Sequence, residues 1–504
     1  MTSLRASIFV LPEPSRHQPA SDLWAEMGAA VASECGDMYV LGSRWQDRVC
    51  RTAEVVVSPD RVMLRYRTIE ARIRRQSGKP TLLDLSVGNL FSLASPQRPE
   101  PVHIVNDVRY AQWARHAAQV SLKDHVRLVG EFVGDLQDAG WVLEQAELTP
   151  LTIAPPQVCN GAGMRALPTE KFHQLVRRPA VWPAGGLGIA IVAPEGGRND
   201  KAAEQIAQAM EALFGRSAPW APRIFRATEP TAGAVTLMLL EDRSDLADLH
   251  DLRLTLRNAE SQGHGFKLAK VSSLSKPYPA QNIAYDLFLI AGGRPWMPVE
   301  PQPALCSLDA GHDKDRARSR WVKVETNQRH GIVSVQAIDT ELAEHIPAAV
   351  LPRLWPTDAH AVLCRDGRMS QERASIEARA ASEQRPLIEA KKSPKAMLWR
   401  ESEAGLAPAT FGDAVIDEHG DVLLQTVRQN VRDYVHPVRL TTQGGDTIDL
   451  ATAFLHQQAV PSISLFHMPR LPGALYFADL VSKLSSDGWP KAIGRGFKVP
   501  EIVP

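Results

Sequence analysis

The hydrophobic positions in the middle of the chain follow the pattern of a parallel α/β unit. An almost unbroken apolar run at 187–193 ends in a Gly-rich turn, and an amphipathic helix is predicted over 200–214. A second apolar run at 234–240 and a helix-like segment at 245–258 continue the alternation. Because strands that are buried on both faces read as apolar runs, the pattern predicts a Rossmann-like sheet here.

Farther along the chain, the predicted strands end in acidic residues. One strand ends at Asp309, another follows near 332–338, and a third, at 361–364, is followed by Arg365 and Asp366. A helix is predicted over 370–384. Carboxylates at the ends of separate strands can converge at one edge of a sheet, so the pattern predicts a ligand site there.

The first part of the chain is less informative. Residues 1–175 show a mixture of strand and helix patterns without a recognisable motif, and the Pro- and Gly-containing stretch 148–183 is typical of a linker. The length of 504 residues allows two to four domains. We therefore predict three segments: a mixed α/β region of unknown role at 1–175, and two further domains at 176–295 and 296–504.

Composition excludes several classes of protein. Lys plus Arg and Asp plus Glu both number 57, so no overall basic excess indicates a nucleic-acid partner, and any phosphate-binding surface must be local. The five cysteines are scattered without a CxxC pair, which argues against a disulfide framework and a zinc site. The first residues lack a signal peptide's apolar core, and no stretch is long enough to cross a membrane, so we expect a cytoplasmic location.

One local concentration of basic residues stands out in this neutral chain. Residues 365–400 hold nine Lys or Arg against five acidic residues, a net of +4 from nine minus five. Neutralisation of phosphates supplies most non-specific affinity for nucleic acids, so this stretch is predicted to follow a nucleic-acid backbone close to Asp366. Alternating Glu and Arg within the predicted helix also allow ordinary surface ion pairs.

Five short motifs follow one another in the second half of the chain. They are Gln281-Asn282-Ile283-Ala284, Gly292-Gly293-Arg294-Pro295-Trp296, Asp309-Ala310-Gly311, Arg365-Asp366-Gly367 and Tyr476-Phe477-Ala478-Asp479, the last expected to open the final helix. In this order they resemble motifs of the MID and PIWI domains of prokaryotic Argonautes, over roughly residues 185–504. The first two resemble the helix and the element that join MID to PIWI, and the other three look like positions of the PIWI carboxylate tetrad. Each alone has an ordinary explanation as a turn or surface residue; their order favours the resemblance.

The resemblance implies an α/β fold with a Rossmann-like MID domain, an RNase H-like PIWI domain and a mixed α+β N-terminal region. It further implies that Asp309, Asp366 and Asp479 hold Mg²⁺ or Mn²⁺, because hard divalent ions take oxygen ligands and two-metal phosphodiester hydrolysis needs several carboxylates. Glu344 is similar to the fourth, glutamate member of the tetrad, with Glu341 as the competing choice.

The resemblance also implies a pocket for the 5′ phosphate of a guide strand. Two positions where the family commonly has a lysine are Asp286 and Ile290 here, which leaves arginine substitution or a different guide-end preference open. Cationic side chains suit a phosphate dianion. The candidates for this pocket are Arg253, Arg257, Lys267 and Lys270, together with the carboxylate of Pro504 as a metal ligand.

Three functions remain open at this point. The length suggests a short Argonaute without a PAZ domain, and short relatives commonly act as guide-binding sensors that activate a separate effector protein. Retention of four carboxylates favours instead a metal-dependent nuclease that cuts a target opposite a guide of RNA or DNA, in defence against invading DNA. A Rossmann-like metabolic enzyme is the third reading, but the Gly-rich turn lacks the GxGxxG pattern of dinucleotide binding.

Overall fold

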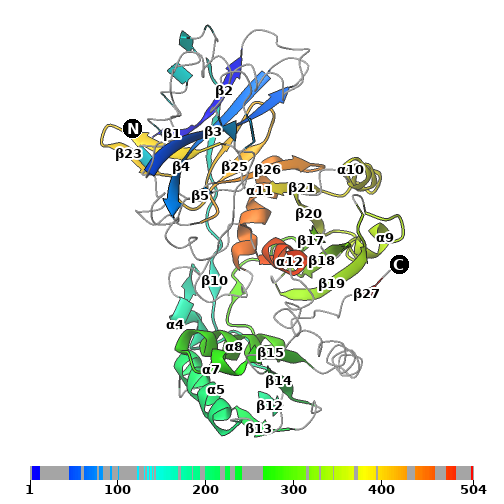
Figure 1. Cartoon of the computed structure of the whole chain (residues 1–504). Coiled ribbons are helices and arrows are strands. Elements are labelled where there is room, and N and C mark those ends of the chain that lie inside the picture. The colour runs from blue at the N-terminus through cyan, green and yellow to red at the C-terminus, as the bar shows by residue number, and fades with distance from the viewer. Residues whose placement is uncertain are drawn as a thin grey trace. The chain divides into compact units, whose positions relative to one another are not determined.

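The computed structural model divides the chain into two compact units (Figure 1). The first unit comprises Met1–Ile153 and Lys391–Thr441, and the second comprises Ala154–Ala390 and Thr442–Pro504. Residues 391–441 thus group with the N-terminal part, whereas the limits 1–175, 176–295 and 296–504 stay a prediction. The structure describes residues 3–11, 45–57, 62–76, 79–82, 91–92, 100–101, single positions between 122 and 140, 144–167, 172–183, 186–192, 199–215, 222–227, 233–240, 265–313, 317–328, 331–343, 346–367, 373–392, 396–427, 437–459, 471, 473–483 and 501–502.

The described part of the first unit consists mainly of antiparallel strands. A long hairpin of β3 (Trp45–Val57) and β4 (Val62–Gln76) pairs along its full length, and β2 (Ile8–Leu11) pairs with β4. The N-terminal strand β1 (Ser3–Ala6) joins β22 (Leu398–Ser402), so segments that are far apart in sequence share one sheet. The other strands of this unit include β5 (Lys79–Leu82), β6 (Phe91–Ser92), β7 (Glu100–Pro101), β8 (Glu144–Gln145), β9 (Thr149–Thr152), β23 (Gly405–Pro408), β24 (Asp413–Ile416), β25 (Val422–Leu424) and β26 (Val438–Gln443).

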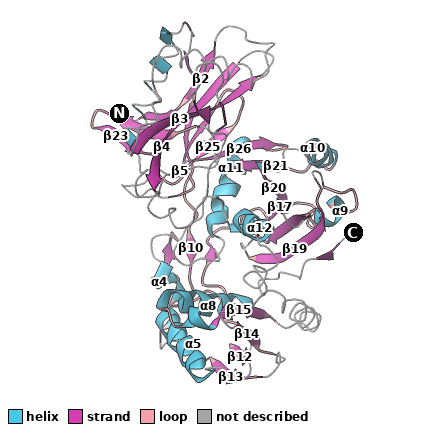
Figure 2. Ribbon diagram, viewed as in Figure 1, coloured by secondary structure: helices cyan, strands magenta, loops and turns pink. Residues whose placement is uncertain are grey.

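The second unit contains a small parallel sheet of four strands in the order β13-β12-β14-β15 (Figure 2). The amphipathic helix predicted after the first strand is α5, and its apolar face packs with α8 on the sheet, as its spacing requires. This arrangement confirms the predicted Rossmann-like sheet; the helix expected at 245–258 lies outside the described residues. The elements are β12 (Gly188–Val192), α5 (Asn199–Phe214), β13 (Arg223–Arg226), β14 (Val235–Leu240), β15 (Phe266–Lys270), α7 (Val271–Leu274) and α8 (Pro277–Ile290).

A larger sheet in the same unit carries the acidic strand ends. The sheet has ten strands in the order β27-β19-β18-β17-β20-β21-β26-β25-β24-β9. The hairpins of β17, β18 and β19 are antiparallel, whereas β20 and β21 run parallel to β17. The mixed sheet confirms the predicted α/β class. Its elements are β17 (Leu305–Asp313), β18 (Arg318–Thr326), β19 (Ile332–Glu341), α9 (Leu351–Leu354), β20 (Val362–Asp366), α10 (Arg373–Ser382), β21 (Leu387–Lys391), α11 (Thr447–His456), α12 (Gly473–Lys483) and β27 (Glu501–Ile502).

Two element boundaries differ from the sequence-based expectation. Strand β17 does not end at Asp309 but continues to Asp313, because its pairing with β18 extends to the end of the hairpin. Helix α12 begins at Gly473, so Asp479 lies in its second half and does not open it. Both differences arise because tertiary pairing decides where an element stops. In the part of the chain that the structure describes, no helix is long and apolar enough to span a membrane.

Candidate metal centre

Three of the four predicted carboxylates converge in the second unit. Asp309 on β17, Asp366 at the end of β20 and Asp479 on α12 each offer an oxygen, and these atoms lie within 4.8 Å of one another. All three residues are buried. Residues that are 57 to 170 positions apart in the chain are thus brought to one point. We call Asp309, Asp366 and Asp479 the carboxylate triad.

The register of the sheet explains why two of these residues meet. Strands β17 and β20 pair in parallel from Leu305 with Val362 to Leu308 with Arg365, and the next residue on each strand is an aspartate. Asp309 and Asp366 therefore lie where the pairing of the two strands stops, a place at which side chains can face a common ligand. Helix α12 packs against β17 and β18 and supplies the third carboxylate (Figure 1).

Gly311 allows α12 to approach β17 this closely. A Cβ atom at this position would lie 2.0 Å from the main-chain oxygen of Ser482, a distance that no side chain can tolerate. Ser482 in turn donates a hydrogen bond from its hydroxyl to Oδ2 of Asp309. Sequence reasoning missed Ser482; its position three residues after Asp479, and hence on the same helical face, was the only available signal.

A buried arginine stands beside the triad. Arg365 immediately precedes Asp366 and is fully buried, and its Nη2 atom lies 2.5 Å from Oε2 of Glu389 on β21. The same nitrogen lies 3.4 Å from Glu377 on α10. A buried guanidinium needs such carboxylate partners, so Arg365 ties the end of β20 to its neighbours and does not face a solvent-exposed phosphate.

A fourth buried aspartate on the same face of the sheet has its own partner. Asp339 on β19 accepts hydrogen bonds from Arg320 on β18, from Nε at 2.6 Å and from Nη2 at 2.7 Å. Arg320 is directly opposite Gly311 in the strand register. This bidentate pair is neutral as a unit, and Asp339 does not belong to the group of carboxylates that could share an ion.

The predicted glutamate, Glu344, lies outside the described residues. Its competitor Glu341 ends β19 at an exposed position, opposite Arg318, which is itself opposite Asp313. Across the two strand pairings, Glu341 is level with Asp313, which lies four residues beyond Asp309 on β17. Glu341 therefore does not join the triad. The segment leading to Glu344 is anchored at Ala343, whose N–H donates to Oγ of Ser319 at 2.9 Å and whose carbonyl oxygen accepts from it at 3.0 Å.

The triad fits a divalent cation by the chemistry of its donors. Carboxylate oxygens are the ligands that Mg²⁺ and Mn²⁺ prefer, and three like charges within 4.8 Å repel one another unless a cation offsets them. The two described cysteines of this sheet offer no competing soft site, because burial raises the pKa of the thiols of Cys306 and Cys364 far above the ordinary value and keeps them protonated. Hard metal ions therefore suit this place.

The two described lysines that were predicted to bind the guide's 5′ phosphate differ in burial. Lys267 on β15 is buried, and its Nζ atom lies 2.5 Å from Oδ2 of Asp286 on α8, also buried. Lys270, at the end of the same strand, is exposed and precedes α7. Of these two lysines, the exposed one offers its ammonium group to a phosphate at lower cost. Arg253, Arg257 and Pro504 lie outside the described residues.

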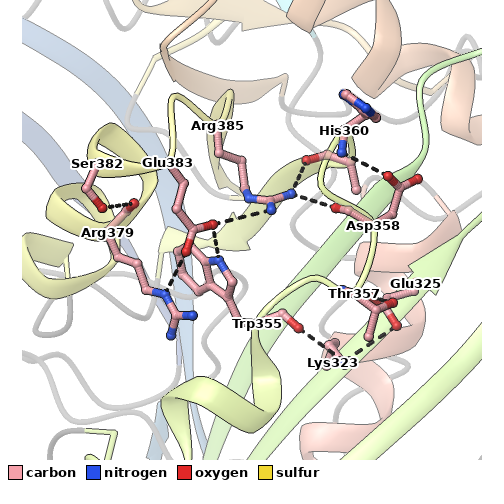
Figure 3. A network of polar contacts seen from close by, with 11 residues as sticks. Lys323, Glu325, Trp355, Thr357, Asp358, His360, Arg379, Ser382, Glu383 and Arg385 are labelled. Carbon is pink, nitrogen blue, oxygen red and sulfur yellow. Dashed lines mark hydrogen bonds and ion pairs between the residues drawn. The ribbon is translucent and has the colours of Figure 1, made fainter.

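The basic stretch does not form a continuous phosphate-binding stripe among the residues described. In Figure 3, Arg379 on α10 and Arg385, which follows the helix, both contact Glu383, and Glu383 also accepts a hydrogen bond from Trp355. Arg379 Nε lies 3.1 Å from Glu383, and its guanidinium stacks 4.3 Å from the centre of the Trp355 ring. Arg385 donates to the carbonyl oxygens of Asp358 at 2.8 Å and of Ala361 at 3.0 Å. Arg379 and Arg385 therefore support the fold, whereas the expectation that the stretch as a whole follows a nucleic acid stays a prediction.

Two glutamates in the same network have lowered pKa values. The hydrogen bond from the Trp355 indole N–H, at 2.6 Å, holds the pKa of Glu383 below its ordinary value, with Arg379 and Arg385 acting in the same direction. Burial raises the pKa of Glu325, but hydrogen bonds from the main-chain N–H and the hydroxyl of Thr357, at 2.7 and 2.9 Å, outweigh it and leave the value lowered (Figure 3). Both glutamates are structural acceptors.

Sequence comparison identifies no relative: no model of a protein family matches the chain, and no curated protein is similar to it in sequence. Solved structures do match. Drosophila Piwi superposes with a TM-score of 0.60 at 12% identity, covering 92% of this chain and 84% of Piwi. The chain has an Argonaute-like fold. The MID and PIWI arrangement implied by the sequence motifs is thereby confirmed at the level of the fold.

Argonautes that hold nucleic acids are among the matching structures. Clostridium butyricum Argonaute, bound to a guide DNA and a target DNA, matches with a TM-score of 0.57 at 11% identity over 85% of this chain. Marinitoga piezophila Argonaute, in complex with a 5′-OH guide RNA and a target DNA, matches with a TM-score of 0.56 at 9% identity over 88% of this chain and 80% of its own. This chain spans 65% of the length of the Clostridium protein.

Proposed function

We propose that this protein binds a short single-stranded guide, uses it to select a complementary target and cuts that target in a metal-dependent reaction. The observation that carries the proposal is the convergence of Asp309, Asp366 and Asp479 within 4.8 Å inside an Argonaute-like fold. Two structures with the same fold hold a guide and a target. Defence against invading DNA in a prokaryotic cytoplasm is the proposed setting, because guide-directed cutting serves to recognise foreign sequence.

The cutting step assigns a role to each carboxylate. Asp309, Asp366 and Asp479 would hold Mg²⁺ or Mn²⁺, and Glu344 would complete the set. When bound, such ions lower the pKa of a water and stabilise the oxygen that leaves the phosphodiester. Because the three aspartates are buried, they would hold the ions away from bulk water.

The guide end would be held by cationic side chains of the MID-like sheet. Lys270 is the leading described candidate because it is exposed, with Arg253, Arg257 and the carboxylate of Pro504 as further candidates. Lys267 would contribute only if its ion pair with Asp286 opened. Phosphate contacts of this kind predict that guide affinity falls as salt rises.

A silent sensor that activates a separate effector protein is the second candidate function. One observation favours it: among the described residues the group that could hold a metal contains three carboxylates, and Glu341 does not supply a fourth. A sensor would bind guide and target without cutting, and the effector would carry the chemistry.

Sequencing of the nucleic acids that copurify with the protein, followed by assays with a matching guide and a labelled target, tests the proposal. We expect short single strands to copurify, salt-sensitive guide binding, and target cutting in Mn²⁺ or Mg²⁺ that Asp366→Asn abolishes while guide binding persists. Binding and effector activation without cutting by the wild type would favour the sensor. Absence of guide binding at low salt would contradict both functions.

A further inference from the structure

Ser482 links two members of the carboxylate triad. Its hydroxyl donates to Oδ2 of Asp309 on β17 and lies 3.1 Å from the main-chain oxygen of Asp479, one turn earlier on its own helix. The residue is 5% exposed, so water does not compete for the hydroxyl. A single side chain on α12 thus contacts both the strand that carries Asp309 and the residue that supplies the third carboxylate.

The hydroxyl has only one hydrogen to give, and the two acceptors are unequal. A carboxylate is the stronger acceptor, because hydrogen bonds to ionised groups are roughly twice as strong as those between neutral groups. The main-chain oxygen of Asp479 is the local alternative that serine commonly uses within a helix. The hydrogen therefore goes to Asp309, and it fixes the rotation of that carboxylate.

Gly311 makes this contact possible. The backbone of Ser482 occupies the space that a side chain at position 311 would fill, with the main-chain oxygen 2.0 Å from an ideal Cβ. Because Gly311 and Asp309 are two apart on one strand, they point to the same face of the sheet, toward α12. The missing side chain and the serine hydroxyl together set the distance between helix and strand.

We propose that Ser482 is a positioning residue of the metal centre: it orients the Asp309 carboxylate and keeps it in register with Asp479 on α12. The inference rests on the proposed function and deepens it, since it names how the ligand set is held. Hydrogen-bonded partners of metal-ligating carboxylates commonly change metal affinity about 10–100-fold when they are removed. Such a residue acts through Asp309 and does not touch the substrate.

Mn²⁺ binding to the full-length Ser482→Ala protein tests the inference without any need for activity. We expect calorimetric Mn²⁺ affinity to fall about tenfold or more, and the Mn²⁺-induced rise in Tm to shrink with it. Ser7→Ala is the matched control: Ser7 is fully buried and accepts a hydrogen bond at 2.8 Å from the Met397 N–H, but it belongs to the other unit. That variant should bind Mn²⁺ like the wild type.

The outcomes separate the two proposals. Wild-type affinity in Ser482→Ala, with the wild type itself binding Mn²⁺, overturns the positioning role and leaves the metal centre intact. No Mn²⁺ binding by the wild type overturns the metal centre, and the inference with it. If Ser482→Ala loses more metal-free stability than Ser7→Ala, two further measurements decide whether the hydroxyl acts through Asp309. Ser482→Thr, which keeps the hydroxyl, should restore Mn²⁺ affinity. In an Asp309→Asn background, Ser482→Ala should cause no further loss of Mn²⁺ affinity, and a further loss there contradicts the inference.

Discussion

The two sheets of the second unit use buried charge in opposite ways. At the larger sheet, two aspartates on strands and one on the helix α12 bring ligand oxygens within 4.8 Å of one another. At the smaller, parallel sheet, Lys267 on β15 pairs with Asp286 on the helix α8 at 2.5 Å. Like charges that are brought together destabilise the fold unless a cation joins them, whereas an opposite pair balances its own charge.

The difference indicates which region is arranged for a ligand. Selection for stability alone gives no reason to bury three carboxylates together, so their convergence favours a bound cation. The lysine–aspartate pair needs nothing further, although it lies in the domain where the guide phosphate is expected. A single charged residue such as Lys267, in the domain where a phosphate is expected, is therefore weaker evidence for a ligand site than a buried cluster of like charges such as the carboxylate triad.

The largest effect on stability is expected at the lysine–aspartate pair. Lys267→Met should leave Asp286 buried without its cation and cost about 3–5 kcal/mol. Thermal unfolding should show a clearly lower Tm. Lys270→Met, at an exposed position of the same strand, is the control and should change stability by less than about 0.5 kcal/mol.

The double variant Lys267→Met, Asp286→Leu sharpens this comparison further. Replacing both partners by apolar residues is often neutral or stabilising, so Tm should return toward the wild-type value. Guide affinity of this variant then shows whether Lys267 binds the guide. A low Tm in the double variant would contradict the view that the pair is self-sufficient.

A smaller loss is expected where α12 meets β17. Gly311→Ala should force the helix away from the strand, because the new methyl group would overlap the main chain of Ser482. Overpacking of this kind costs about 1–3 kcal/mol, and Mn²⁺ should no longer raise Tm. Gly445→Ala serves as the control, since its Cβ would meet only side-chain atoms of Leu450, the nearest of them Cδ1 at 3.3 Å. Retention of the Mn²⁺ effect in Gly311→Ala would show that the close approach is unnecessary.

The smallest effect concerns a carboxylate that already has its partners. The pKa of Glu325 is lowered in the fold. Its ionised carboxylate therefore stabilises the fold fully at pH values above 4.5, the ordinary pKa of a glutamate, and this stabilisation is lost as pH falls below 4.5 through the lowered pKa. Glu325→Gln should therefore show a smaller loss of Tm than the wild type between pH 6 and pH 3, pH values spanning roughly the ordinary carboxyl range. Parallel curves for the two proteins would remove Glu325 from the acid-sensitive groups. Glu401→Gln, at an exposed position, is the control.

The sequence predicts the elements that carry the site better than the contacts that hold it. Apolar runs and acidic strand ends predict that Asp309 and Asp366 lie on separate strands whose ends can converge at one edge of a sheet, whereas the direct pairing of β17 with β20 is visible only in the structure. Contacts of Ser482 with Asp309, and of Lys267 with Asp286, depend on how a helix docks on a sheet. Local pattern carries no information on that docking.

The charge pattern along the chain does not show which cations the fold itself uses. Within the cation-rich stretch 365–400, Arg365 and Arg385 are buried and bonded within the fold, which their sequence positions do not indicate. The sequence also does not predict that residues 391–441 group with the N-terminal part, because strand partners such as β1 and β22 are nearly 400 positions apart. Pairing over such separations is decided by tertiary structure.

Diffraction from crystals soaked in Mn²⁺, with anomalous differences recorded, tests the central claim most directly. We predict a Mn²⁺ peak bound by Asp309, Asp366 and Asp479, and, with guide and target present, a second peak about 3.5–4 Å from the first. The peaks should disappear in Asp366→Asn. An anomalous map without a peak at the triad, at a Mn²⁺ concentration that saturates other metal-dependent nucleases, would contradict the claim that these three carboxylates form a metal centre.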